Sequence, residues 1–137
     1  MELNKSTKIL ISISALMSAL AGIIHLWIAP IHWFHSPGHG VFFLTVGVAQ
    51  VLWANLVWRQ PASRLYYIGA LMSGWLIALY VITRWLPSPF GHGPEAVDMI
   101  GLTCKLFEGL AMATLAILIF QELAIKALRE LPQADLS

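Results

Sequence analysis

Histidine is concentrated in the segment HLWIAPIHWFHSPGHG, which occupies residues 25–40 between two apolar stretches. Imidazole nitrogen is a common ligand of zinc and copper, and a metal site needs three or four donors that converge on one point. Three of these histidines are spaced i, i+3 and i+7, and a further histidine follows in a later loop. The sequence therefore predicts a candidate copper or zinc site formed by His32, His35, His39 and His92. The alternative is that these rings lie at a membrane surface, where imidazole suits the headgroup region or senses pH.

A second set of polar residues is embedded in the apolar stretches. At 1.5 Å per helical residue, Lys105 and Glu108 lie about 15–20 Å beyond Glu95. A lone charge at such a depth in lipid costs about 2.5–3.5 kcal/mol, so we expect these two side chains to pair and to face inward. The expected interior network comprises His25, Gln50, Arg84, Asp98, Lys105 and Glu108. It forms either a proton or ion path, or a polar pocket, or a satisfied network that only fixes the helix register.

Other kinds of chemistry find little support. A b-type haem needs axial ligands at matching depth on facing helices. His25 would have to pair with a loop histidine or with a methionine such as Met99 or Met112, so we expect no haem. No Ser-His-Asp arrangement, phosphate loop, CxxC or HExxH pattern is present, and we expect no enzymatic activity. The single cysteine, Cys104, lies in an apolar run and is expected to be a small buried residue.

The elements that must position these residues are apolar helices. The chain has 137 residues, of which 58% are hydrophobic and 11% charged, against about 25% charged in soluble domains. Such a chain cannot cover its surface in water, so most of it must face lipid. Apolar runs near the membrane-spanning length predict spans over residues 9–29, 41–58, 65–86 and 95–120, with a cytoplasmic helical extension over 121–131. We expect a single all-α domain over residues 1–137, an antiparallel, up-down bundle of four transmembrane helices.

Proline and glycine mark the expected helix ends. Pro30 should end or kink the first helix, and residues 31–40 should form a loop. Ser36 and Pro37 offer an N-cap and a first-turn proline for the second helix, and Pro94 should open the fourth in the same way. Small residues inside the spans are expected where helices approach closely, either within the chain or against another subunit. They are Gly47, Ala54, Gly69, Ser73, Gly74, Gly109, Ala111, Ala113 and Ala116.

The basic residues predict the orientation. No lysine or arginine occurs in the connections over residues 30–40 and 87–94. The basic residues near the remaining span ends are Lys5, Lys8, Arg59, Arg64, Lys126 and Arg129. By the positive-inside rule both termini are cytoplasmic, and the histidine-rich loops are extracytoplasmic.

Three stretches carry a family resemblance. AGIIHLWIAP, GVFFLTVGVAQVLWA and RWLPSPFGHGPEAVDMIGL resemble small four-helix integral membrane proteins of prokaryotes, over residues 21–119. The matching features are His25, the G-x6-G-x2-Q pattern that ends at Gln50, and the residues Arg84, Pro87, Gly91 and Glu95. The resemblance implies a prokaryotic cell (inner) membrane and supplies no reaction. The architecture is also similar to accessory helical subunits of copper-dependent membrane monooxygenases.

The sequence also contains two pairs of similar segments. ALMS occurs at residues 15–18 and 70–73, and SPGHG at 36–40 resembles SPFGHG at 88–93. This pattern indicates a tandem repeat of helical hairpins; chance recurrence in a small apolar alphabet is the alternative.

We therefore expect a non-catalytic accessory or structural subunit, or an interaction module, in contact with the lipid bilayer. Its protein partners would be other membrane subunits or a second copy of the chain. The alternatives are a copper- or zinc-binding membrane protein that uses the loop histidines, and a small proton-coupled carrier or channel that uses the interior charges. A net charge of +1 gives no reason to expect nucleic acid as a partner.

Overall fold

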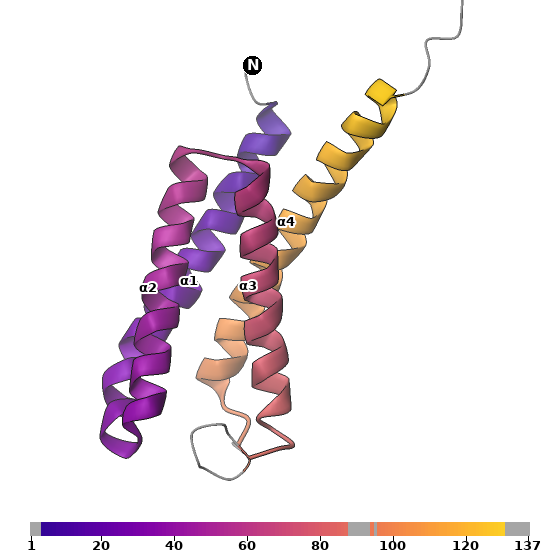
Figure 1. Cartoon of the computed structure of the whole chain (residues 1–137). Coiled ribbons are helices and arrows are strands. Elements are labelled where there is room, and N and C mark those ends of the chain that lie inside the picture. The colour runs from indigo at the N-terminus through magenta and orange to yellow at the C-terminus, as the bar shows by residue number, and fades with distance from the viewer. Residues whose placement is uncertain (1–3, 88–93, 95, 131–137) are drawn as a thin grey trace, which may run out of the picture.

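The computed structural model describes residues 4–87, 94 and 96–130, except for the side chain of His35. Four helices lie within these residues. They are α1 (Lys5–His35), α2 (Pro37–Arg59), α3 (Ser63–Ile82) and α4 (Met99–Glu130). The helices alternate in direction along the chain (Figure 1). Helix α1 packs against both α2 and α4, and α3 packs against α4, whereas α2 and α3 meet at few residues. The predicted all-helical architecture with four helices is confirmed.

Each of these helices is long and apolar enough to cross a membrane. Large apolar side chains project outward along their length. Leu71 is 73% exposed and Phe34 is 88% exposed. An apolar outer surface on this scale is compatible with contact to lipid.

The junction between α1 and α2 differs from the expected ten-residue loop. Helix α1 continues through Pro30 to His35, and α2 begins at Pro37. Ser36 alone has extended backbone angles, with φ −156° and ψ 109°. Proline removes one backbone donor and strains one turn, which the long helix tolerates here. Pro37 stands at the first helical position, as expected, and its missing N–H costs nothing there.

The start of α4 also corrects a prediction. Pro94 does not open this helix, because residues 96–98 are not helical and α4 begins at Met99. Asp98 stands immediately before it, and its Oδ1 atom accepts a hydrogen bond of 2.7 Å from the Gly101 backbone N–H. An aspartate in this position satisfies a helix donor that has no partner within the helix, and its charge suits the positive helix end. The strong cap at Asp98 therefore sets the helix start.

The bundle has two chemically different ends. The histidine end is defined here as the end at the α1–α2 junction, and the basic end as the opposite one, where α1 begins and α4 finishes. An apolar core fills the half nearer the basic end. Within it, the Trp53 indole N–H donates a hydrogen bond to the Leu65 carbonyl at 2.9 Å, so the polar atom of this ring has a partner. The core comprises Ile11, Ala15, Trp53, Ala54, Val57, Tyr66, Leu115 and Leu118.

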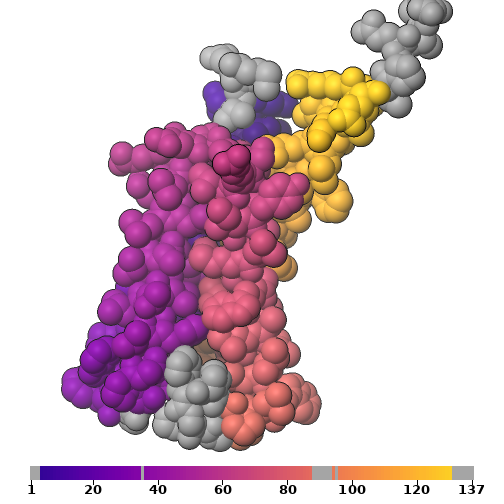
Figure 2. All heavy atoms as spheres, viewed as in Figure 1, coloured from indigo at the N-terminus to yellow at the C-terminus, as the bar shows by residue number. Residues whose placement is uncertain are grey.

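The last turns of α4 extend away from the other helices at the basic end (Figures 1 and 2). Most side chains of residues 121–130 are exposed. Glu122 accepts a hydrogen bond of 2.8 Å from the Ser63 hydroxyl, and Lys126 lies 3.9 Å from Glu130. Exposed ion pairs of this kind add at most about 1 kcal/mol, so this extension contributes little to the bundle.

The small residues divide into two groups. A Cβ atom added at Gly69 would lie 2.2 Å from the Trp53 ring, so this position requires glycine. A Cβ added at Gly109 would meet nothing within 4 Å among the described residues. Close helix packing within the chain is therefore found at Gly69 and not at Gly109, where contact with another subunit stays a prediction. Position on the helix, and not residue size alone, decides the role.

Candidate functional site: a cavity that ends on a buried polar network

A cavity of about 270 Å³ lies between the helices in the half nearer the histidine end. Residues from α1, α2, α3 and α4 line it. Asp98, whose side chain is 56% exposed, is part of this lining and marks the mouth. His25, Cys104 and Lys105 line its inner part. The volume is close to the lower limit of about 300 Å³ for small-molecule pockets.

The inner part of the cavity rests on a chain of buried hydrogen bonds. Gln50 on α2 bridges His25 on α1 and Glu108 on α4. Its Oε1 lies 2.8 Å from His25 Nδ1, and its Nε2 donates to Glu108 Oε1 at 3.0 Å. Gln50 and Glu108 are fully buried, and His25 is 3% exposed. Lys105 donates to the second carboxylate oxygen of Glu108. Helices α1, α2 and α4 are thus joined by one continuous network.

The network fixes the tautomer of His25. The Gln50 amide nitrogen donates to Glu108, so the amide oxygen of Gln50 is left to accept from His25 Nδ1–H. Lys105 already balances the charge of Glu108, so a neutral imidazole keeps the site electrically neutral. The remaining ring nitrogen, Nε2, then carries a lone pair. This lone pair faces α4.

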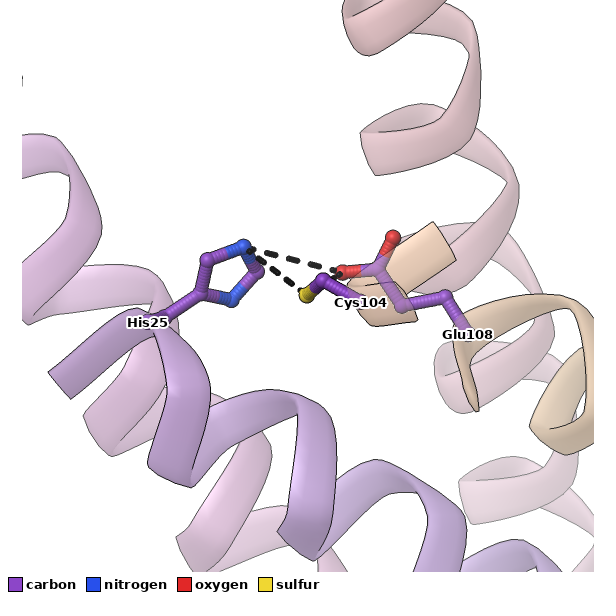
Figure 3. Close-up of side chains that lie close together, drawn as sticks. All are labelled: His25, Cys104 and Glu108. Atoms are coloured by element: carbon purple, nitrogen blue, oxygen red, sulfur yellow. Dashed lines mark hydrogen bonds and ion pairs between the residues drawn. The ribbon is translucent and has the colours of Figure 1, made fainter. Parts of the chain in front are cut away.

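Cys104 lies at the point to which His25 Nε2 is directed (Figure 3). Its Sγ atom is 3.5 Å from His25 Nε2 and 3.8 Å from Glu108 Oε1. The same sulfur is 3.8 Å from the Ala21 carbonyl oxygen. One thiol proton therefore has three acceptors within reach. Cys104 is buried, as expected, but its polar surroundings differ from those of a residue that only fills space.

The Arg84 guanidinium and the Tyr80 ring line the outer part of the cavity. The Arg84 guanidinium lies 3.9 Å from the centroid of the Tyr80 ring and 3.8 Å from Asp98 Oδ2. Lys105 Nζ approaches the same ring at 5.6 Å. The Tyr80 hydroxyl is buried and has no hydrogen-bond partner among the described residues. Buried hydroxyls normally have a partner, so this one is available to a ligand.

The loop histidines are brought together only in part. The rings of His32 and His39 lie 5.8 Å apart between centroids, and both pack against Phe43. His25 also stacks on Phe43, with the ring centroids 5.5 Å apart. The side chain of His35 and the whole of His92 lie outside the described residues. The four-histidine metal site therefore stays a prediction.

Most of the expected interior network is assembled around the cavity. His25, Gln50, Lys105 and Glu108 form one contiguous cluster, while Arg84 and Asp98 pair separately near the mouth. Sequence reasoning assigned Cys104 no part in it. The available signal was its i, i+4 spacing to Glu108, which places both side chains on one helix face.

The chain was compared with protein-family models, curated proteins and solved structures, and nothing matched. The geometry of the cavity and its polar floor therefore carries the functional argument.

Proposed function

We propose that this chain is an integral membrane protein that binds a small ion or polar solute in the cavity between its helices. The observation that carries the proposal is the meeting of this cavity with the buried His25–Gln50–Glu108–Lys105 network. A purely structural network fixes the helix register best when its polar groups are enclosed. This one borders about 270 Å³ of space.

The orientation proposed for the membrane follows the basic residues. Lys5, Arg59 and Lys126 all lie toward the basic end, which we assign to the cytoplasm. The mouth beside Asp98 then opens toward the extracytoplasmic side, and the apolar surface of the bundle faces the lipid of a prokaryotic cell membrane. A ligand would reach the network from outside the cell.

A binding pocket fits the geometry better than a continuous channel. The cavity lies in the half nearer the histidine end, while the apolar core fills the half nearer the basic end. An ion would gain no charged partner among the residues of that core. We therefore favour a site that is open to one side, either a receptor site or the outward-open state of a carrier.

The lining favours a small polar ligand. Arg84 and Lys105 supply positive charge, Asp98 supplies negative charge, and the Tyr80 hydroxyl is available for a hydrogen bond. The volume of about 270 Å³ admits an ion with a few waters or a solute of a few heavy atoms, because water occupies about 30 Å³ per molecule.

The other expectations stay predictions. A role as an accessory subunit, with other membrane subunits or a second copy as partner, would use the apolar outer surface. The loop-histidine metal site would use His32, His35, His39 and His92, of which His32 and His39 line the cavity. Neither contradicts a ligand in the cavity.

The proposal is tested by the reactivity of Cys104, the single cysteine of the chain. Chelator-treated protein in liposomes is exposed to a small water-soluble methanethiosulfonate, added on the outside or inside. The reagent should modify Cys104 from the side of the histidine end, because the thiol lines the cavity. Mass spectrometry of the intact protein measures the modification.

Two matched variants in a Cys104→Ala background serve as controls. Gly109→Cys lies on the same helix but away from the other helices, so it should stay unreactive in lipid. Ala62→Cys is exposed between α2 and α3 and should react only from the opposite side. The proposal fails if Cys104 is unreactive from both sides while Ala62→Cys reacts and Cys104 reacts after denaturation.

A further inference from the structure

Three donor atoms of different chemical types meet at the floor of the cavity. They are His25 Nε2, Cys104 Sγ and Glu108 Oε1, and all lie within 4.8 Å of one another. Figure 3 shows the imidazole of α1 directed at the thiol and carboxylate of α4. Cys104 and Glu108 are one helical turn apart and so present their donors on one face. We propose that these residues form a binding site for a zinc-class divalent metal ion.

The distances suit tetrahedral coordination. Zinc binds nitrogen, oxygen and sulfur at about 2.0–2.3 Å, so donor pairs around a tetrahedral ion lie about 3.3–3.6 Å apart. The observed separations are 3.5 Å from His25 to Cys104, 3.9 Å from His25 to Glu108 and 3.8 Å from Cys104 to Glu108. Binding requires each longer pair to close by a few tenths of an ångström, which side-chain rotation supplies.

The hydrogen bonds around the donors already hold them in a ligating form. The Gln50 amide oxygen accepts the hydrogen bond from His25 Nδ1–H, so the lone pair of Nε2 is available to a metal ion. A histidine ligand in proteins usually donates its other N–H to such a partner, which orients the ring. Lys105 donates to Oε2 of Glu108. Oε1 accepts one hydrogen bond from Gln50 and keeps a second lone pair, on the side of Cys104, for a metal ion.

The donor set selects the class of metal. Magnesium and calcium take oxygen ligands, so an imidazole and a thiol disfavour them. Copper(I) prefers sulfur and imidazole to carboxylate. Zinc accepts all three groups, and three protein ligands leave one position open. His25 and Cys104 line the cavity, so the open position faces it.

The binding step balances without a redox partner. The Cys104 S–H bond breaks, the sulfur–metal bond forms, and the proton leaves to water in the cavity. The site then changes from neutral to a net charge of +1, because the dication replaces one proton. A chloride or hydroxide ion in the open position would restore neutrality.

This inference rests on the proposed function, because the cavity is the path by which the ion reaches the thiol. It names the ligand class of that site. An ion held by three protein groups and open to a cavity is exchangeable, which suits a protein that takes up or transfers metal more than one that uses metal only to fold.

The experiment is a titration of the chelator-treated full chain in detergent or nanodiscs with Co²⁺, followed by displacement with Zn²⁺. We expect one Co²⁺ per chain and a thiolate-to-cobalt charge-transfer band in the near ultraviolet, which Zn²⁺ abolishes. Cys104→Ser should remove the band. His25→Ala and Gln50→Leu should each weaken binding about 10–100-fold, the latter by releasing the imidazole from its orienting partner.

Matched controls separate this site from the loop histidines. His32→Ala and His39→Ala should keep the cobalt band and the affinity, since neither residue belongs to the donor cluster. Lys105→Met should bind the ion more tightly, because the carboxylate is no longer shared. Thermal unfolding of each variant without metal shows whether it is folded.

Each outcome decides the matter. Loss of metal binding in His32→Ala or His39→Ala, with retention in Cys104→Ser, overturns the inference in favour of a site at the loop histidines. Ready labelling of Cys104 without any cobalt band also overturns it, but leaves the proposed pocket intact. If Cys104 is neither labelled nor metal-bound, both proposals fail. Protection of Cys104 from labelling by Zn²⁺ supports both.

Discussion

Gly22 on α1 and Gly47 on α2 face one another across a close helix contact near the site. A Cβ atom added at Gly22 would lie 2.9 Å from the Gly47 carbonyl oxygen, and one added at Gly47 would lie 2.8 Å from the Gly22 carbonyl oxygen. The added Cβ at Gly22 would also be 3.1 Å from Gln50 Cβ. This close approach is what allows Gln50 to reach His25 from the neighbouring helix.

Gly47→Ala should therefore destabilise the protein by about 1–3 kcal/mol, because the added methyl group meets backbone and cannot be relieved by a side-chain rotation. Gly109→Ala is the matched control, since its Cβ would enter open space. It should leave stability unchanged or raise it slightly through helix propensity. Thermal unfolding in one detergent compares the two variants. Equal stabilities would contradict the contact between α1 and α2.

Gln50→Leu keeps the approximate volume of the side chain but removes both hydrogen bonds of the bridge. The His25 N–H and one Glu108 oxygen would then be buried without that partner, which should lower stability by about 1–3 kcal/mol. Chemical or thermal unfolding measures the loss. Gln50→Leu should also be non-additive with His25→Ala, because the two residues share one interaction. Additive losses would argue against the bridge.

Glu108→Ala should be the more damaging change, with a loss of about 3–5 kcal/mol, because it leaves the Lys105 ammonium without its carboxylate. The double variant Lys105→Met with Glu108→Gln should recover most of that loss, since no uncompensated charge remains. The recovery is measured by the same unfolding assay. A double variant as unstable as Glu108→Ala would show that the charge pair is not the cause.

Tyr80→Phe should leave the ligand-free protein as stable as before or slightly more stable. Its hydroxyl is buried without a hydrogen-bond partner among the described residues, so removing it ends a desolvation cost. A destabilisation of more than 1 kcal/mol, on the order of one hydrogen bond, would mean that the hydroxyl is bonded in the protein. Binding of a polar solute in the cavity should weaken in the same variant.

The orientation is tested with reporter fusions. A green fluorescent protein fused after Ser137 should fluoresce, because the orientation proposed from the basic residues places that terminus in the cytoplasm. Alkaline phosphatase fused after Pro87, with the rest of the chain deleted, should be active, because α3 has then crossed outward. An active phosphatase fused after Ser137 would reverse the assignment, and with it the side on which the cavity opens.

Much of the fold could be read from the order of the residues. Runs of about 20 apolar residues can be satisfied in lipid only as helices. The cost of an unpaired charge in lipid also predicts that Lys105 and Glu108 pair, since they are three residues apart on one helix. These conclusions depend on local spacing and on transfer free energies, which a sequence contains.

Tertiary structure alone decided the rest. Helical periodicity says which residues share a face but not which helix that face meets, so the bridge from His25 through Gln50 to Glu108 appears only once α1 packs between α2 and α4. Competing local signals were also resolved by the fold, as when α1 continued through Pro30 and Asp98 rather than Pro94 set the start of α4. The role of Cys104 could not be predicted from the sequence, where a lone thiol in an apolar run indicates only a small buried residue. The packing of α1 against α4 places an imidazole and a carboxylate beside this thiol.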